Sequence, residues 1–367
     1  MQQKGPVTVL IAPLDWGLGH ATRCVPIINE LVDRGARVII AASGSQKSLL
    51  MQEFPLLEFH DIPGYEIRYK KGVFLKYALL FAVPFLLKQI RRENKWLSAF
   101  LEHRRIDAVI SDNRYGLHHP HLYSVFITHQ LAIRTGLGTL FDWILLKWNY
   151  ALIRKFSACW VPDNLKDFSF AGKLSHPPQP PTVPVKYIGI LSRLKFSRMP
   201  VEKNSLLVLL SGPEPARTCF EKKIFSQLKE TALKTFVVRG LPGSDQTTPF
   251  IRSGVVVYNH LPSAELNELL NRSEFILTRA GYSSIMDLAK LKKNALLIPT
   301  RGQTEQEYLG SYLHEKKWMV SIPEKKFKLG EAIRIFQQAE LVPLGGEETS
   351  LYKVLEEFLN TCIDKKR

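Results

Sequence analysis

The sequence predicts an α/β protein made of two domains, each built around a parallel sheet. Short apolar runs of strand length alternate with helical patterns, and this alternation favours strands joined by crossover helices. The chain has 367 residues, of which 45% are hydrophobic, so it is long for one core and sufficient for two. We expect a first domain over residues 1–190, a linker over 191–204, a second domain over 205–345 and a C-terminal helical segment over 346–367.

The first domain opens with a strand, a glycine-containing loop and a helix. The strand is predicted at Val7–Ala12 and the helix at Ala21–Asp33, and a second strand at Arg37–Ala42 completes a βαβ unit. His20 stands where the loop meets the helix, at the carboxyl edge of the sheet where ligands bind in open α/β folds. The alternative is a histidine that only caps or packs. Gly17 and Gly19 lack the third glycine of a dinucleotide fingerprint, which disfavours a nicotinamide or flavin cofactor.

Asp112 follows the next apolar run, Asp107–Ile110, and therefore falls at the same edge as His20. A carboxylate there could orient and charge-stabilise an imidazole base, or be the base itself. The alternative is a loop aspartate that bonds to local backbone. His129 follows a strand at Ser124–Thr128 and is a candidate for contacting an acceptor or a donor. A nearby cluster of histidines suggests a metal site, which we disfavour because no carboxylate or cysteine lies at a confirming spacing; its members are His118, His119 and His121.

The second domain repeats the order of strand, glycine loop and helix. An apolar strand at Leu206–Leu210 is followed by Gly212 and by a helix from about Ala216. Further strands are predicted at Thr235–Val238 and Val255–Tyr258. The five prolines of the preceding segment, Ser175–Pro184, exclude a helix or a central strand there and predict a loop.

The stretch from Glu274 to Tyr312 contains two successive strand–loop–helix units. The first loop, Thr278 to Gly281, opens a helix whose N-terminus offers backbone N–H groups to an anion. Asp287 lies one turn further in, where a carboxylate can hold ribose hydroxyls. The second loop, Pro299–Gln303, leads to a helix start rich in amide and carboxylate groups, which suit a sugar. The stretch thus predicts a nucleotide-sugar site, and the alternative is a solvated polar helix start.

These residues resemble the donor-sugar region of family 28 glycosyltransferases, which include a cell-wall N-acetylglucosaminyltransferase that acts on a lipid-linked intermediate. The resemblance is carried by the RAG triplet at 279–281, the acidic Asp287 eight positions after the arginine, and a strand ending in Pro299 before Gln306-Glu307. It covers the whole chain in arrangement and is motif-specific at 14–23, 211–217 and 278–308. Asp287 replaces a glutamate of that enzyme and Glu307 replaces a glutamine, so the donor sugar need not be N-acetylglucosamine.

The resemblance implies a GT-B architecture, in which two Rossmann-like domains face each other across a cleft and the C-terminal helix packs on the first domain. It implies inverting transfer of a hexose from a UDP-type donor to a hydroxyl acceptor, without metal or cofactor. His20, alone or with Asp112, would be the catalytic base, and helix starts near Gly212 and Gly281, with Arg279, would hold the diphosphate in place of a metal. The implied donor-binding residues are Gly212, Arg279, Ala280, Gly281, Ser283, Ser284, Asp287, Gln303, Gln306 and Glu307, and those on the acceptor side are Gly17, Gly19 and His129.

Composition adds an expectation about location. The formal charge is +16, and the apolar run Tyr77–Leu87 is flanked by Lys76, Lys88, Arg91 and Arg92, a pattern typical of proteins that lie on anionic membranes. The segment Leu140–Phe156 could line the same surface. The alternative for each segment is a core helix with solvated cations. The four cysteines are widely scattered and no signal segment opens the chain, so we expect a reduced cytoplasmic protein on the inner membrane face with a lipid-linked acceptor.

Two other functions are compatible with parts of the sequence. A nucleotide-sugar epimerase would use the same fold and the same diphosphate site, but its soluble substrate would not explain the membrane-like segments. A nucleic-acid binder would explain the charge, but the chain lacks a recognition motif or a stacking platform.

Overall fold

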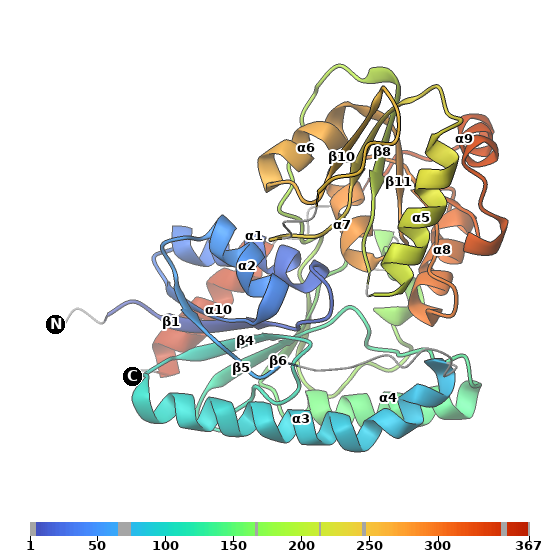
Figure 1. Cartoon of the computed structure of the whole chain (residues 1–367). Helices are drawn as coiled ribbons and strands as arrows, with labels where there is room; N and C mark the ends of the chain where they lie inside the picture. The colour runs from blue at the N-terminus through green and yellow to red at the C-terminus, as the bar shows by residue number, and fades with distance from the viewer. Residues whose placement is uncertain are drawn as a thin grey trace. The chain divides into compact units, whose positions relative to one another are not determined.

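A computed structural model describes residues 5–64, 75–165, 168–212, 214–243, 247–345 and 351–365, with side chains of the 75–83 segment excluded. The chain divides into two compact units. Unit 1 falls within residues 1–16, 20–191 and 347–367, and unit 2 within 17–19 and 192–346. The two are described separately below (Figure 1).

Unit 1 contains a parallel sheet whose described strands run in the order β3-β2-β1-β4-β5-β6-β7. Because β1 pairs with β2 on one side and with β4 on the other, the strand order reverses between β1 and β4. The strands are β1 (Thr8–Pro13), β2 (Arg37–Ala41), β3 (Glu58–His60), β4 (Ala108–Asp112), β5 (Tyr123–Ile127), β6 (Ala158–Val161) and β7 (Val185–Tyr187).

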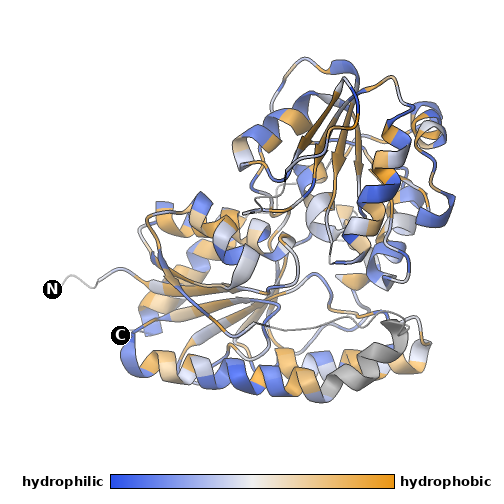
Figure 2. Cartoon of the chain, viewed as in Figure 1, coloured by the Kyte–Doolittle hydropathy of each residue, from blue (hydrophilic) through white to orange (hydrophobic). Residues whose placement is uncertain are grey.

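Helices cover both faces of this sheet, with α1, α2 and α10 on one side and α3 and α4 on the other (Figure 1). The strands between these helices are strongly hydrophobic (Figure 2), so the helices and the sheet bury apolar surface against each other. On the α3 face, Leu97 packs with Leu10, Ile39 and Val109 of three adjacent strands. The helices are α1 (Gly19–Asp33), α2 (Gly44–Glu53), α3 (Leu75–His103), α4 (Thr139–Ile153) and α10 (Leu351–Lys365).

Helix α10 returns from the far end of the chain to unit 1. Its Phe358 ring lies 5.4 Å from the ring of Trp160 on β6 and 5.7 Å from that of Tyr123 on β5. Glu357 forms an ion pair with Lys186 on β7. The helix therefore completes the apolar cover over the β5–β7 side of the sheet.

Unit 2 is a second parallel sheet, with described strands in the order β10-β9-β8-β11-β12-β13. Its order reverses between β8 and β11. Helices α5 and α9 pack on one face, where Phe220, Ile224 and Ile333 join the apolar core. The strands are β8 (Glu202–Leu209), β9 (Lys234–Val238), β10 (Val255–Tyr258), β11 (Ser273–Thr278), β12 (Leu296–Leu297) and β13 (Val320–Ser321), and the helices are α5 (Ala216–Leu228), α6 (Ser263–Arg272), α7 (Tyr282–Lys290), α8 (Thr304–Glu315) and α9 (Leu329–Gln338).

The structure confirms the predicted two-sheet α/β class and differs from the sequence analysis in detail. Strand β8 begins at Glu202, inside the expected linker, and the units divide between Leu191 and Ser192. The expected C-terminal helix begins at Leu351. Strands β3, β6 and β13 were not predicted; β3 and β13 are two- or three-residue edge strands, and pairing with a neighbour defines them more than their own side chains do.

Candidate active site

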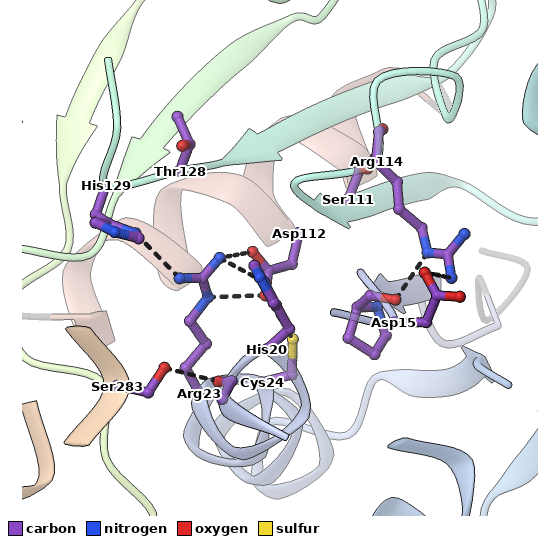
Figure 3. A network of polar contacts seen from close by, with 12 residues as sticks. Asp15, His20, Arg23, Cys24, Ser111, Asp112, Arg114, Thr128, His129 and Ser283 are labelled. Carbon is purple, nitrogen blue, oxygen red and sulfur yellow. Dashed lines mark hydrogen bonds and ion pairs between the residues drawn. The ribbon is translucent and has the colours of Figure 1, made fainter. Parts of the chain in front are cut away.

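A cluster of polar side chains lies at the point where the strand order of unit 1 reverses (Figure 3). His20 is on the first turn of α1, and Asp112 is the last residue of β4, paired in register with Pro13 at the end of β1. Nδ1 of His20 is 3.1 Å from Oδ2 of Asp112. The carboxyl ends of β1 and β4 thus bring together two residues that are 92 positions apart in the sequence.

Arg23 joins these two residues and was missed by the sequence analysis. Its Nε donates to Oδ2 of Asp112 at 2.8 Å, and its Nη2 contacts the other carboxylate oxygen. Its Nη1 lies 3.2 Å from Nδ1 of His129, which follows β5. A signal was available, because residues three apart on a helix share a face, and Arg23 is three positions after His20.

The charges of this cluster favour a neutral histidine beside an ionised aspartate. Burial raises the pKa of Asp112, but the charges of Arg23 and His20 and their hydrogen bonds outweigh it and lower the pKa to about 2. Burial and the nearby Arg23 cation lower the pKa of His20, against the opposing effect of Asp112. At neutral pH the imidazole is therefore uncharged and can accept a proton.

A second buried arginine braces the loops around this cluster. Arg114 is fully buried, and its Nη1 donates to Oε1 of Glu93 at 2.8 Å. Its Nε donates to the carbonyl oxygen of Pro13 at 2.7 Å, and its Nη2 lies 3.6 Å from Oδ1 of Asp15 (Figure 3). These contacts tie the loop after β4 to the end of β1. In the same β1 loop, Gly17 adopts a φ of 72°, which favours glycine, and Gly19 begins α1.

The predicted donor residues of unit 2 gather at the reversal point of its own sheet. Gly281 is the N-cap of α7, and its lack of a side chain leaves the backbone at this helix start open to close approach. Ala280 is fully buried beside it, whereas Ser283 and Ser284 are partly exposed. Gly212, with a φ of 103°, follows β8, the strand that pairs with β11.

The side chain of Arg279, which was expected at the diphosphate, lies inside unit 2. Arg279 is 1% exposed, and its Nη1 donates to Oε2 of Glu324 at 2.7 Å and to the carbonyl of Ile298 at 3.2 Å. Its guanidinium carbon lies 3.8 Å from the ring centre of Phe220. The positive charge is therefore directed into unit 2, where it ties α5 and the β12 end together.

Asp287 is partly buried and accepts a hydrogen bond from the hydroxyl of Ser192. The same hydroxyl accepts from the backbone N–H of Leu194 at 3.1 Å. Burial raises the pKa of Asp287 to about 6, against the effects of Ser192 and Arg193. This carboxyl group therefore changes its charge in a pH range where most aspartates are already ionised.

The polar start of α8 shapes the loop that precedes it. Oε1 of Gln306 accepts from the backbone N–H of Thr300 at 2.9 Å, and Oε1 of Glu307 accepts from that of Gly302 at 2.8 Å. Gln303 is the N-cap of the helix. Gln306 is 5% exposed, whereas Glu307 is exposed to solvent. Both side chains thus hold the loop with one oxygen each.

Within the part of the chain that the structure describes, no group of three or more histidine, cysteine, aspartate and glutamate side chains is arranged to hold a metal ion. The three clustered histidines have other surroundings. The ring of His118 lies 5.5 Å from that of Phe156, and burial together with Lys155 and His119 lowers its pKa to about 4. His119 and His121 lie ring to ring at 5.5 Å.

Comparison with solved structures shows that the chain has the GT-B fold. The glycosyltransferase of kitacinnamycin is similar with a TM-score of 0.63 and 15% identity, covering 97% of this chain and 96% of that one. The Arabidopsis thaliana UGT89C1, solved with UDP-L-rhamnose, gives a TM-score of 0.63 at 14% identity, covering 98% and 100%. MurG of Acinetobacter baumannii gives 0.53 at 13%, covering 90% of each chain.

The sequence itself points to a narrower relationship. Residues 221–344 match the glycosyltransferase family 28 C-terminal domain, and this range contains α7, α8 and the loops before them. A search of curated protein sequences found no match to the chain. The second unit is thus similar to family 28 glycosyltransferases, as the resemblance of its donor region implied, and this match together with the fold supports a glycosyltransferase.

The internal position of Arg279 generates a testable prediction. Arg279→Ala should lower the free energy of unfolding by about 1–3 kcal/mol, because Glu324 loses a charged hydrogen-bond partner. Glu324→Ala should have a similar effect, and the double variant should cost less than the sum of the two single variants. Urea unfolding of the four proteins measures this coupling, and strictly additive effects would contradict the pair.

Proposed function

We propose that the protein transfers a hexose-type sugar from a nucleotide diphosphate donor, a UDP-sugar, to a hydroxyl group of an acceptor. The observation that carries the proposal is the neutral His20 held against the ionised Asp112 at the carboxyl edge of unit 1. Transfer to a hydroxyl needs a base for its proton, and a neutral imidazole serves this purpose at neutral pH.

His20 is a better base than Asp112. Asp112 is fully buried and shares both oxygens with Arg23, and a carboxyl group with a pKa of about 2 binds a proton weakly. In the proposed reaction, the acceptor hydroxyl gives its proton to Nε2 of His20 while its oxygen attacks the anomeric carbon. The bond from that carbon to the diphosphate oxygen breaks, and attack from the opposite side inverts the configuration.

The leaving diphosphate carries negative charge, which the N-terminus of α7 would stabilise through the helix dipole. Gly212 would allow a close approach of backbone to the same phosphates. Arg279 would contribute through its backbone and its effect on the loop. We propose no metal ion and no resident cofactor for this step.

Donor recognition would involve Asp287 at the ribose and the α8 start at the sugar. An ionised Asp287 can accept hydrogen bonds from ribose hydroxyls, and the complex of the similar Arabidopsis protein with UDP-L-rhamnose supports a UDP donor for proteins of this fold. Gln306 and Glu307 each use one oxygen for the loop. Their remaining polar atoms would face the sugar. The epimerase alternative finds no support in these comparisons.

The acceptor would be lipid-linked, and the support lies on α4. Within its first six residues four large apolar side chains are 40–65% exposed: Leu140, Phe141, Trp143 and Ile144. Lys147 lies 5.8 Å from the Trp143 ring centre. Lys88, Arg91 and Arg92 of α3 are also exposed. Apolar groups beside cations suit an anionic membrane surface.

The expected apolar run Tyr77–Leu87 forms part of α3, but its side chains up to Val83, including Lys76 and Phe81, lie outside the described residues. Of the rest, Phe85 is partly buried. Among the helices of the described chain, none has the length and hydropathy to cross a membrane. The proposed attachment is therefore peripheral and on the cytoplasmic face.

The first prediction tests the base. His20→Ala should lower turnover by roughly 10²–10⁴-fold, the usual contribution of a general base. Affinity for UDP should stay nearly unchanged, because the donor residues belong to unit 2. Turnover with a panel of UDP-sugars and calorimetric titration with UDP measure the two effects. His121→Ala, which alters an exposed histidine of the same unit, is the matched control. Full activity in the His20 variant would refute its role.

The second prediction tests the ribose contact. Asp287→Asn should weaken UDP binding by about 1–3 kcal/mol, as expected when a charged acceptor is lost. In the unaltered protein, affinity should fall as the pH drops through about 6, because the protonated carboxyl group loses its charge. Calorimetry between pH 5 and 8 should show this fall in the control Glu340→Gln, which changes an exposed acid of unit 2, and not in Asp287→Asn. If UDP affinity depends on pH in the same way in both variants, Asp287 does not contact the ribose.

The third prediction tests the membrane surface. The protein should co-sediment with vesicles that contain anionic lipid more than with neutral ones, and about 1 M salt should release it because screening becomes short-ranged. Trp143→Ser with Ile144→Ser should reduce binding. Phe250→Ser, which changes an 84% exposed ring in unit 2, should not. If all three proteins bind alike, or none binds, the α4 surface has another use and the acceptor is soluble.

A further inference from the structure

The imidazole of His20 has two polar neighbours at the same nitrogen. Nδ1 lies 3.1 Å from Oδ2 of Asp112 and 2.8 Å from Nη2 of Arg23. A neutral imidazole carries one proton, on one of its two nitrogens, so these neighbours make opposite demands. The carboxylate can only accept a hydrogen bond from Nδ1, and the guanidinium can only donate one to it.

Each neighbour stabilises a different tautomer. If Asp112 accepts from Nδ1–H, the lone pair is on Nε2 and the ring can act as a base at that atom. If Arg23 donates to the Nδ1 lone pair, the proton is on Nε2 and the ring is a hydrogen-bond donor there. The choice between the two arrangements therefore sets what His20 presents to a ligand.

The guanidinium of Arg23 is fixed in its position from several directions. Its Nε and Nη2 contact the two oxygens of Asp112, and its Nη1 contacts Nδ1 of His129 at 3.2 Å. The side chain is 2% exposed. Since arginine stays protonated and only donates, His129 must accept at Nδ1 and carry its proton at Nε2. The shorter of the two contacts to His20 also belongs to Arg23.

We propose that Arg23 is a positioning residue that selects the tautomer of His20, holding its proton on Nε2 through a hydrogen bond from Nη2 to Nδ1. The basic tautomer then requires that this hydrogen bond be exchanged for the one from Nδ1–H to Asp112. In that exchange Nε2 releases a proton to water and Nδ1 takes one up, so the ring remains neutral. This deepens the proposed function and rests on it only for the role of His20 as base.

The described groups that face this ring come from three elements. Arg23 is on α1, as is Cys24, whose Sγ lies 3.9 Å from Oδ2 of Asp112. Asp112 ends β4, and His129 follows β5. Arg23 opposes protonation of His20, and Asp112 favours it. Removing the Arg23 cation should therefore raise the pKa of His20 and move the acid limb of the rate profile to higher pH.

The experiment is NMR spectroscopy of the full-length protein with ¹⁵N-labelled histidine, with His20→Gln and His129→Gln used to assign the signals. In the unaltered protein, the Nδ1 resonances of both rings should have the shift of an unprotonated nitrogen. In Arg23→Met, Nδ1 of His20 should move to the range of a protonated nitrogen. An Nδ1–H proton on His20 in the unaltered protein, or no change in the variant, would overturn the proposal.

Arg23→Met leaves Asp112 buried without its partner and could unfold the protein. Arg23→Lys keeps the charge but lacks the planar fork, so it can pair with Asp112 without fixing a donor at Nδ1. It should shift His20 in the same direction. An Arg23→Lys variant that keeps the native histidine signals elsewhere and leaves His20 unchanged contradicts the proposal.

The outcomes separate this inference from the proposed function. If His20→Ala retains full turnover while Arg23→Lys switches the tautomer, the base assignment is wrong and the inference about Arg23 stands. If His20→Ala is inactive and the tautomer does not respond to Arg23, the base assignment stands and Arg23 has only a structural role.

Discussion

The ion pair between Arg23 and Asp112 is the interaction on which the candidate active site depends. Both side chains are almost completely buried, and a buried charge is tolerated only when it is paired and hydrogen-bonded. The pair satisfies this requirement through two contacts between the guanidinium and the carboxylate. Because it joins α1 to the end of β4, the same pair that stabilises the packing also fixes the position of His20. The same atoms therefore stabilise the packing of α1 against β4 and position the proposed base.

The topology of the two sheets explains why the polar groups lie where they do. In a parallel sheet all strands end at one edge, and at the point where the strand order reverses the connections leave toward opposite faces, which opens a crevice for a ligand. His20 and Asp112 flank this point in unit 1, between β1 and β4. Gly212 and Gly281 flank it in unit 2, between β8 and β11. In each unit the polar loops thus lie at the carboxyl edge of the sheet, where the strand order reverses.

Much of this arrangement could be predicted from the sequence, because apolar runs and glycine loops are local signals. The strands that frame both sites were predicted, and so was the position of His20 and Asp112 at one sheet edge, since the segments that follow parallel strands begin at the same edge. The direction in which a buried side chain points, in contrast, depends on residues that are distant in the sequence. Arg279 turns inward because Glu324 and Phe220, both distant in sequence, receive it. The inward direction of Arg23 depends on Asp112, 89 positions away, and only its spacing of three from His20 was a local signal.

Helix α10 gives unit 1 an order of assembly. Its Phe358 covers Trp160 and Tyr123, so this part of the unit 1 sheet keeps an uncovered apolar surface until α10 has been synthesised. Residues 192–345, in contrast, form nearly all of unit 2 as one continuous segment. Although domains commonly fold in the order in which they are synthesised, here the second unit can close its core before the first has received α10.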